Sequence, residues 1–282
     1  MLSFMFKISR FRFWIYTGGT FVVGYALAVN TIGDFFRFDY YIYLLYFFFF
    51  ANVFIYGVND YWDGETDKNN PKKDEKEHRL TNSEKRNLLR VIYLVVGISL
   101  ILLFFQTNLE RILFSIFLLL SYFYSSPPLR FKERPFLDFS SNYLYIMPGI
   151  FAYSMLSNYL PSLIILTGAY FHISAMHIFS AIPDIEYDRA AGIKTTPVFI
   201  GEKYALILTL IFWLILAVIV IKLANFRLLS FLVFLYPLFP FLLLIKGSLD
   251  INKLYWYLPY VNTGLGGLLF FALIINKNIL GV

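Results

Sequence analysis

Long apolar runs separated by shorter polar stretches set the pattern of this chain. Each run is about 17 to 25 residues long, the length that an α-helix needs to cross the hydrocarbon core of a membrane. The predicted spans are 13–31, 40–58, 88–106, 109–125, 138–158, 161–181, 204–222, 228–245 and 255–275. We therefore expect an all-α membrane protein with about nine transmembrane helices, folded as one domain over residues 1–282.

Lysine and arginine are distributed unevenly between the two sides that these spans define. Nineteen of the 24 Lys and Arg residues fall on the side of the N-terminus. Because positively charged loops stay in the cytoplasm, this asymmetry places the N-terminus and the loops 59–87, 126–137 and 182–203 there. The expected location is the cell membrane, with these three loops capping a site on the cytoplasmic side.

The composition supports a membrane protein and excludes several kinds of catalytic and metal site. The chain is 59% hydrophobic and 15% charged, with a mean hydropathy of +0.65, which is too apolar for an ordinary soluble domain. Its net charge of +6 suits an anionic membrane surface and an anionic substrate, and gives no reason to invoke nucleic acid. The absence of cysteine excludes disulfides, thiolate catalysis and cysteine-based metal sites.

Four acidic residues lie in the eight positions 60–67, directly after the second span. If the helix continues at about 100° per residue, one face carries an amide and three carboxylates. These are Asn59, Asp60, Asp63 and Asp67. Like charges this close repel unless a cation lies among them, and Mg²⁺ prefers hard oxygen ligands. The cluster is therefore a candidate metal site, in which Asp60 lies at the edge of the face and is alternatively placed to orient a phosphate-binding base.

A second acidic cluster follows the sixth span and contains Asp184 and Asp188, one helical turn apart. Two such clusters are suited to hold one diphosphate through Mg²⁺. His177 lies seven residues before Asp184, hence about 20° from it around a helix, and is a candidate pocket residue. The alternative is a histidine that hydrogen-bonds to a neighbouring helix.

Basic residues on the same predicted side are candidates to bind the diphosphate. The fourth span ends in Tyr124-Ser125-Ser126-Pro127-Pro128-Leu129-Arg130-Phe131-Lys132, where the double proline stops the helix. Arg130 and Lys132 follow this stop, and Arg189 and Lys194 follow the second acidic cluster. The alternative is that these residues only orient the chain in the membrane.

Taken together, these motifs resemble the intramembrane prenyltransferases of the UbiA superfamily. The first motif of that family, Asn-Asp-x-x-Asp-x-x-x-Asp, is matched by the face that begins at Asn59, and the second, Asp-x-x-x-Asp, by Asp184 and Asp188. The Tyr-Ser-x-Pro-Pro-x-Arg loop is matched from Tyr124 to Arg130. The resemblance implies nine helices around a central cavity in which two Mg²⁺ ions hold a prenyl diphosphate.

Within that superfamily the chain is most similar to the lycopene elongase subgroup. The matching stretches are Arg12-Phe13-Trp14-Ile15-Tyr16, Asn70-Pro71-Lys72-Lys73 and the run from Ser180 to Thr196. The resemblance implies Mg²⁺-dependent transfer of a prenyl group from an allylic diphosphate to a lipophilic acceptor, here lycopene or a related carotenoid. Asp63, Asp67, Asp184 and Asp188 would be the catalytic metal ligands, and Arg12 and Tyr124 candidate pocket residues.

Several alternatives stay open at the level of sequence. Similar motifs occur in enzymes that prenylate quinone precursors or glycerol-phosphate lipids. A polytopic cation transporter would also carry acidic clusters, although transport paths place ionisable residues near the membrane midplane, whereas these clusters lie at helix ends. A lipid-binding scaffold would have no need for two matched metal clusters.

Overall fold

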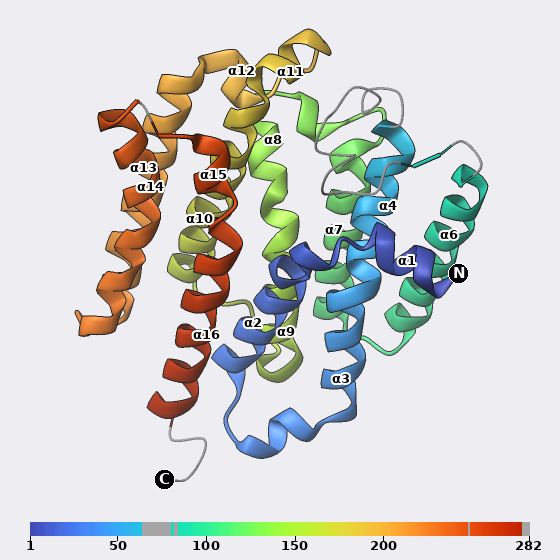
Figure 1. The fold of residues 1–282 in the computed structure, drawn as a ribbon. Helices are drawn as coiled ribbons and strands as arrows, with labels where there is room; N and C mark the ends of the chain where they lie inside the picture. Colours follow the sequence, from blue (N-terminus) through green and yellow to red (C-terminus); the bar gives the residue numbers. More distant parts are fainter. Residues whose placement is uncertain (64–79, 82–83, 248, 278–282) are drawn as a thin grey trace. The chain divides into compact units, whose positions relative to one another are not determined.

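The computed structural model describes residues 1–63, 80–81, 84–247 and 249–277, and regular structure in these residues is helical (Figure 1). Within these described residues, six helical segments are long and apolar enough to cross a membrane. They are Phe38–Asp63, Lys85–Phe104, Leu163–Ala190, Glu202–Leu223, Leu228–Ile245 and Ile251–Asn276. The other three predicted spans, 13–31, 109–125 and 138–158, are helical over most of their length but are not among these six. The protein is therefore a multi-pass helical membrane protein.

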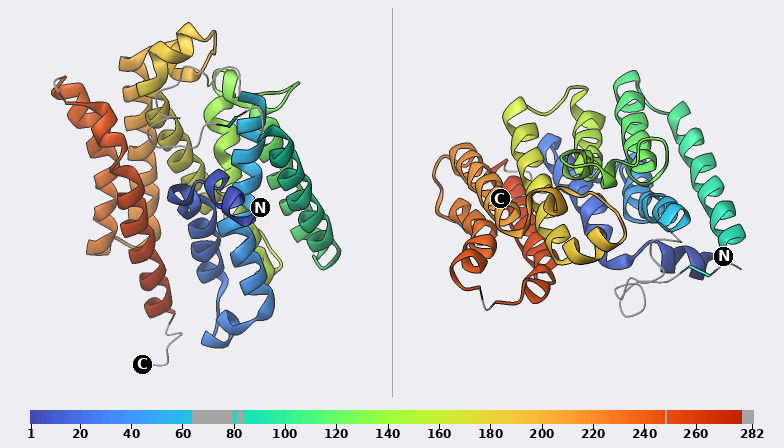
Figure 2. Two further views of the ribbon diagram at one scale, coloured as in Figure 1. Left: turned by 45° about the vertical axis from the view of Figure 1, so that its right-hand side comes forward. Right: turned by 90° about the horizontal axis from the view of Figure 1, so that it is seen from above.

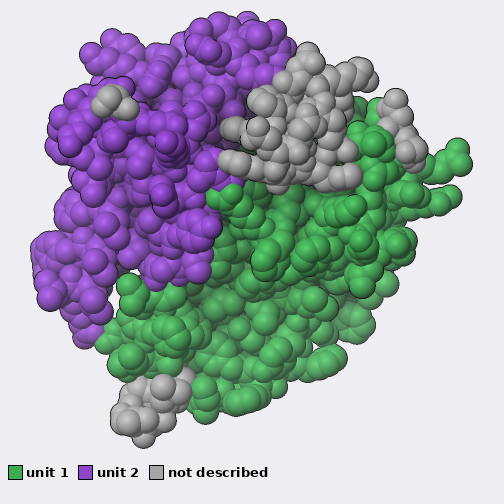
Figure 3. All heavy atoms as spheres, in the orientation of Figure 1, with its two compact units in different colours: residues 1–129, 147–160, 266–282 green, residues 130–146, 161–265 purple. Residues whose placement is uncertain are grey.

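The chain divides into two compact units, coloured separately in Figure 3. Unit 1 comprises residues 1–129, 147–160 and 266–282, and unit 2 comprises residues 130–146 and 161–265. The α-helices of unit 1 are α1 (Leu2–Ile8), α2 (Thr20–Ala28), α3 (Phe38–Leu45), α4 (Ala51–Asp63), α6 (Lys85–Phe104), α7 (Asn108–Ser125) and α9 (Met147–Ser157). Helix α16 (Leu258–Asn276) begins in unit 2 and ends in unit 1.

Aromatic side chains fill the core of unit 1. Five ring pairs among Phe47, Phe114, Phe117 and Phe151 have centroids 5.4 to 6.3 Å apart, and all four side chains are buried. Such pairs add about 1 kcal/mol each to the burial of their surface. This cluster joins the central part of the Phe38–Asp63 segment to α7 and α9, and so supports the helix that carries the first acidic motif.

Two segments of unit 1 are π-helical, Ile15–Gly19 and Tyr46–Phe50, and they pack against each other. A π-turn displaces backbone carbonyls from their usual donors. The amide of Asn52 donates to the carbonyl oxygens of Phe47 and Phe48 at 3.1 and 2.9 Å, and the hydroxyl of Thr17 donates to Phe47 O at 2.7 Å. The two buried polar side chains therefore satisfy the carbonyls that the irregular turn exposes.

Unit 2 contains α8 (Leu137–Ser140), α10 (Leu163–Ala181), α11 (Ile185–Ala190), α12 (Thr196–Ile200), α13 (Glu202–Leu223), α14 (Leu235–Ile245) and α15 (Ile251–Tyr255). Helices α10 and α13 lie side by side over much of their length (Figure 2). Gly168 of α10 permits this close approach, because a Cβ atom there would lie 3.2 Å from the side chain of Ile219. Helix α10 leads directly to the second acidic motif.

The predicted span 138–158 is not one continuous α-helix. It consists of α8, a 3₁₀ segment from Ser141 to Tyr145, and α9. The side chains of Ser141 and Asn142 donate to the carbonyl oxygen of Asp138 at 3.3 and 2.5 Å. Such local side-chain bonds compete with the regular helical ladder, which explains the break.

Candidate functional site

The first acidic motif ends α4, where the structure confirms the predicted shared face of Asn59 and Asp63. The amide of Asn59 donates to the Asp63 carboxylate at 2.6 Å and to the hydroxyl of Ser125 at 3.0 Å. Asp63 is only 2% exposed. Ser125 is the last residue of α7 and belongs to the double-proline loop, so two motifs far apart in the sequence meet within unit 1.

Asp60 forms an ion pair with Arg10 in the same unit. The guanidinium donates to the Asp60 carboxylate at 2.6 Å and lies over the ring of Tyr56, 4.6 Å from its centroid. Asp60 is buried, at 3% exposure, and Arg10 is mostly buried, at 12%. The contact with Arg10 is compatible with the second of the two roles that the sequence offered for Asp60, and the choice between orienting a base and binding metal stays a prediction.

The chemistry of the donor set suits Mg²⁺ within the residues that the structure describes. Asn59, Asp60 and Asp63 all present oxygen atoms, the ligands that hard divalent cations prefer. Asp67 lies outside the described residues, and among those that are described no group of three or more histidines and carboxylates converges on one point. The ligand set of the first motif therefore stays a prediction.

The second acidic motif lies in unit 2, where α10 passes through a 3₁₀ turn, Ile182–Asp184, into α11. Both Asp184 and Asp188 are partly exposed. The hydroxyl of Thr195 lies 3.4 Å from the Asp188 carboxylate, and Ile193 N donates to Asp188 O at 2.8 Å. The turn that brings Ile193 back to Asp188 passes through Gly192, whose φ of 75° favours glycine.

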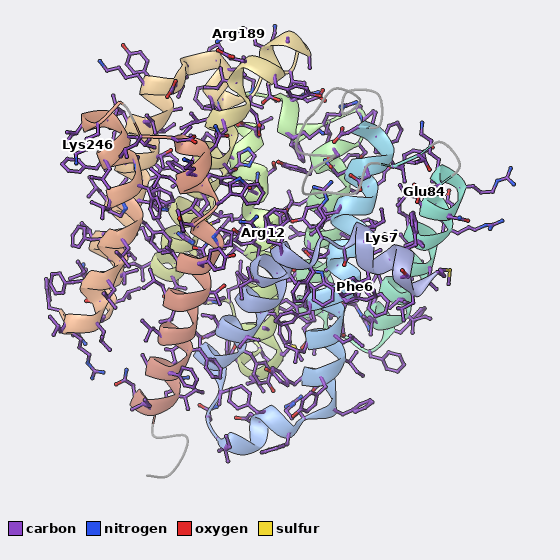
Figure 4. All side chains as sticks on the ribbon, in the orientation of Figure 1. Phe6, Lys7, Arg12, Glu84, Arg189 and Lys246 are labelled. Atoms are coloured by element: carbon purple, nitrogen blue, oxygen red, sulfur yellow. The ribbon has the colours of Figure 1, made fainter. Side chains whose placement is uncertain are left out.

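The predicted basic residues occupy different places in unit 2. Arg130 precedes the 3₁₀ segment Phe131–Glu133 and forms an ion pair with Glu133. Arg189 and Lys194 are exposed, and Figure 4 shows Arg189 at the outer end of α11. Lys132 is partly exposed. Their binding of a diphosphate stays a prediction.

The three candidate pocket residues are His177, Tyr124 and Arg12, and His177 lies near a carboxylate outside the two acidic motifs. Its Nε2 lies 3.9 Å from an oxygen of Asp138, which is fully buried. Tyr124 is partly buried next to Ser125, and Arg12 is exposed on the N-terminal segment labelled in Figure 4. Arg10, two residues before Arg12, pairs with Asp60 of the first acidic motif.

Sequence reasoning missed three residues that form hydrogen bonds near the two motifs: Arg10, which donates to Asp60, and the pair Thr196 and Asp138, in which the threonine hydroxyl donates to the carboxylate. Arg10 and Asp60 are separated by 50 positions, and Asp138 and Thr196 by 58. Periodicity relates residues only within one helix, so neither pairing could be read from it. Two features of the sequence could have indicated these pairings. Asp60 lies at the edge of the acidic face, and Asp138 is a lone acidic residue near the start of an apolar span.

Comparisons with known proteins agree with the motifs. A sequence profile described as the UbiA prenyltransferase family matches residues 17–274. The lycopene elongase/hydratase of Haloarcula japonica is 38% identical over 269 residues, which cover 94% of this chain and 89% of that protein. The corresponding protein of Halobacterium salinarum is 37% identical, with 94% and 95% covered.

A solved structure supports the same fold. The structure of a UbiA homolog from Archaeoglobus fulgidus bound to GPP and Mg²⁺ has a TM-score of 0.71 to this chain, at 21% identity. The alignment covers 96% of this chain and 99% of that one. At this identity the likeness establishes a shared fold.

Proposed function

The chain belongs to the UbiA prenyltransferase family, and from this premise we propose that it transfers a prenyl group from an allylic diphosphate to lycopene or a related carotenoid. It is a transferase of prenyl groups by family. The single observation that carries the choice of acceptor is the similarity to lycopene elongase/hydratases, 36–38% identical over about 94% of the chain. The donor class is supported by solved relatives bound to GPP or DMAPP together with Mg²⁺.

In this proposal the two acidic motifs hold two Mg²⁺ ions and the diphosphate. Asp63 and Asp67 act from the first motif, and Asp184 and Asp188 from the second. Asn59 holds the Asp63 carboxylate through its 2.6 Å hydrogen bond. Bound Mg²⁺ supplies positive charge that stabilises the departing diphosphate.

Basic side chains complete the charge balance around the diphosphate. The proposed ligands are Arg130, Lys132, Arg189 and Lys194, and we add Arg10, which Asp60 holds in place at 2.6 Å. An arginine fixed by a carboxylate is suited to phosphate because its planar donors match two oxygens at once. Loss of the diphosphate leaves an allylic carbocation, which the terminal double bond of the acceptor then attacks. The new C–C bond leaves a cation on the acceptor carbon, and loss of a proton or addition of water, with release of a proton, neutralises it.

An apolar chamber would protect this cation from water. We propose nine membrane helices around a central cavity, with the N-terminus and the active site on the cytoplasmic side, and one prenyltransferase domain over residues 1–282. The apolar surroundings exclude water from the reacting carbon, and aromatic rings stabilise positive charge near their faces. Arg12, Tyr124 and His177 remain candidate pocket residues.

The deciding experiment tests acceptors in parallel. Purified protein in lipid with Mg²⁺ is incubated with lycopene, with an aromatic quinone precursor and with a glycerol-phosphate lipid, using dimethylallyl and geranylgeranyl diphosphates as donors. Prenylated lycopene is the expected product. A product only from the aromatic or the glycerol-phosphate acceptor would reassign the substrate, and no release of diphosphate in any pairing would contradict prenyl transfer and favour the cation transporter.

The metal assignment is tested with variants in the same assay. Asp63→Asn and Asp184→Asn should each lower turnover at least a hundredfold while the protein stays folded in detergent, because a neutral amide is a poorer Mg²⁺ ligand. Asp34→Asn is the matched control, since Asp34 accepts hydrogen bonds from the backbone of Asn30 and Thr31 in an exposed turn. Full activity of both motif variants would refute the assignment.

A further inference from the structure

A fully buried carboxylate in unit 2, Asp138, has no place in the mechanism so far. It is 0% exposed and lies on the short helix α8. Its two oxygens accept hydrogen bonds from Thr196, one from the backbone N–H at 2.6 Å and one from the hydroxyl at 2.5 Å. A buried charge is costly unless it is hydrogen-bonded, so this arrangement is a specific requirement of the fold at this point.

A third hydrogen bond joins Thr196 to the residue before α8. The Thr196 hydroxyl accepts from Phe136 N at 2.7 Å while it donates to Asp138. Asn142 fixes the backbone on the other side of the carboxylate, through its 2.5 Å bond to Asp138 O. Thr196 is itself fully buried. The first residue of α12 is therefore held by donors and acceptors with little freedom to shift.

This clamp lies next to a candidate metal ligand. Thr195, the residue before Thr196, places its hydroxyl 3.4 Å from the carboxylate of Asp188. The two threonines are consecutive, so a displacement of Thr196 moves Thr195 with it. Asp138 is therefore connected, through two consecutive threonines, to a polar contact of the second acidic motif.

Asp138 also reaches the segments on either side of this motif. Its own backbone N–H donates to Arg134 O at 2.9 Å, just after the 3₁₀ segment that follows Arg130. His177, on α10 and seven residues before Asp184, has its Nε2 3.9 Å from the Asp138 carboxylate. Asp138 thus contacts the basic loop through its backbone N–H, and α10 and the segment that follows Asp188 through its carboxylate.

We propose that Asp138 is a positioning residue for Mg²⁺ binding, which holds Thr196 so that Thr195 fixes the orientation of the Asp188 carboxylate. The proposal rests on the proposed function in that it takes Asp188 as a Mg²⁺ ligand. Residues that hold a metal ligand in place typically change metal affinity about 10- to 100-fold when they are replaced.

The test compares Asp138→Asn, Thr196→Val and Thr196→Ser in the full-length protein. Asparagine retains one acceptor but turns an N–H₂ toward a second donor, and valine removes the hydroxyl at nearly constant shape. Serine keeps both hydrogen bonds and is the conservative rescue. Asp34→Asn serves again as a control for a carboxylate-to-amide change at a hydrogen-bonded turn.

Calorimetry in detergent measures the Mg²⁺-dependent binding of inorganic diphosphate to each variant. The melting temperature of each variant is measured in parallel. Asp138→Asn and Thr196→Val should raise the Mg²⁺ concentration at half-saturation about tenfold. Thr196→Ser and Asp34→Asn should leave it unchanged. If Asp138→Asn does not fold, the valine and serine pair at position 196 decides the question.

The outcomes separate this proposal from the choice of substrate. An unchanged Mg²⁺ titration with only a lowered melting temperature would reduce Asp138 to a packing role and overturn the proposal. Failure of the wild type to bind diphosphate at any Mg²⁺ concentration would overturn it as well. Weakened Mg²⁺ binding in the variants, in a protein that prenylates none of the tested acceptors, would support the positioning role while the acceptor assignment fails.

Discussion

Replacing Arg10 with alanine should destabilise the protein by about 3 kcal/mol, the low end of the range for breaking a buried ion pair. The figure follows from burial, since Arg10 and Asp60 are only 12% and 3% exposed and solvent screens their 2.6 Å contact poorly. Without the guanidinium, Asp60 retains its other contacts but loses its positive partner. The contact of Arg10 with Tyr56, with 4.6 Å between guanidinium carbon and ring centroid, is lost as well.

A second ion pair in the same unit provides the matched control for this prediction. Arg37 and Asp39 are also 2.6 Å apart, but they are 47% and 39% exposed. Exposed pairs contribute about 0 to 1 kcal/mol, so Arg37→Ala should be nearly neutral. The free energy of unfolding is measured for both variants in mixed detergent micelles.

The double variant Arg10→Ala with Asp60→Asn tests the electrostatic reason directly. In the double variant neither charge is present, so no buried carboxylate is left without a positive partner. The double variant should therefore be more stable than Arg10→Ala alone. Equal losses for Arg10→Ala and Arg37→Ala would refute the argument from burial. A double variant no more stable than the single one would show that packing of the arginine side chain dominates.

Two further predictions concern helix packing in unit 1, and unfolding in the same micelles checks both. Gly24→Ala should destabilise the protein by about 2–3 kcal/mol through overpacking, because the new Cβ atom would lie 2.1 Å from Gly149 O. At Gly97 a Cβ atom meets open space, so Gly97→Ala should stabilise α6 by up to about 1 kcal/mol. Equal effects of the two substitutions would contradict the close helix contact at Gly24. Asn52→Leu should cost about 2 kcal/mol, since carbonyls of the π-helical segment Tyr46–Phe50 lose their donor, and an unchanged stability would show that this turn does not need the amide.

Local patterns predicted the elements that depend only on neighbours in sequence. Helix α7 matches the predicted span 109–125 and ends at Ser125, two residues before the double proline that was expected to stop it. The helical register of Asn59 and Asp63 was correct, as their 2.6 Å hydrogen bond shows. Each feature is set by residues within a few turns of one another, which is what the rules of helical periodicity and of proline at helix ends describe.

Irregular helices lay beyond these rules. Apolarity predicted a span over 138–158, yet the polar side chains of Ser141 and Asn142 bond to the backbone there and break it into shorter helices. Asn52 likewise connects the two π-helical turns in unit 1, because its amide donates to a carbonyl of one turn and to the hydroxyl of Thr17, 35 positions earlier, in the other. Hydropathy measures how well a segment suits lipid, and it is insensitive to such local competition for hydrogen bonds.

The sequence by itself determined that this protein crosses a membrane with many helices, that it carries two acidic motifs and a double-proline loop, and hence which family it resembles. Only the tertiary structure decided that Arg10 pairs with Asp60 and that Asp138 holds Thr196. The physical reason is the range of the interactions. Hydrophobic spans and helix faces follow from residues a few positions apart, whereas a buried charge takes its partner from whichever segment the fold brings within hydrogen-bonding distance.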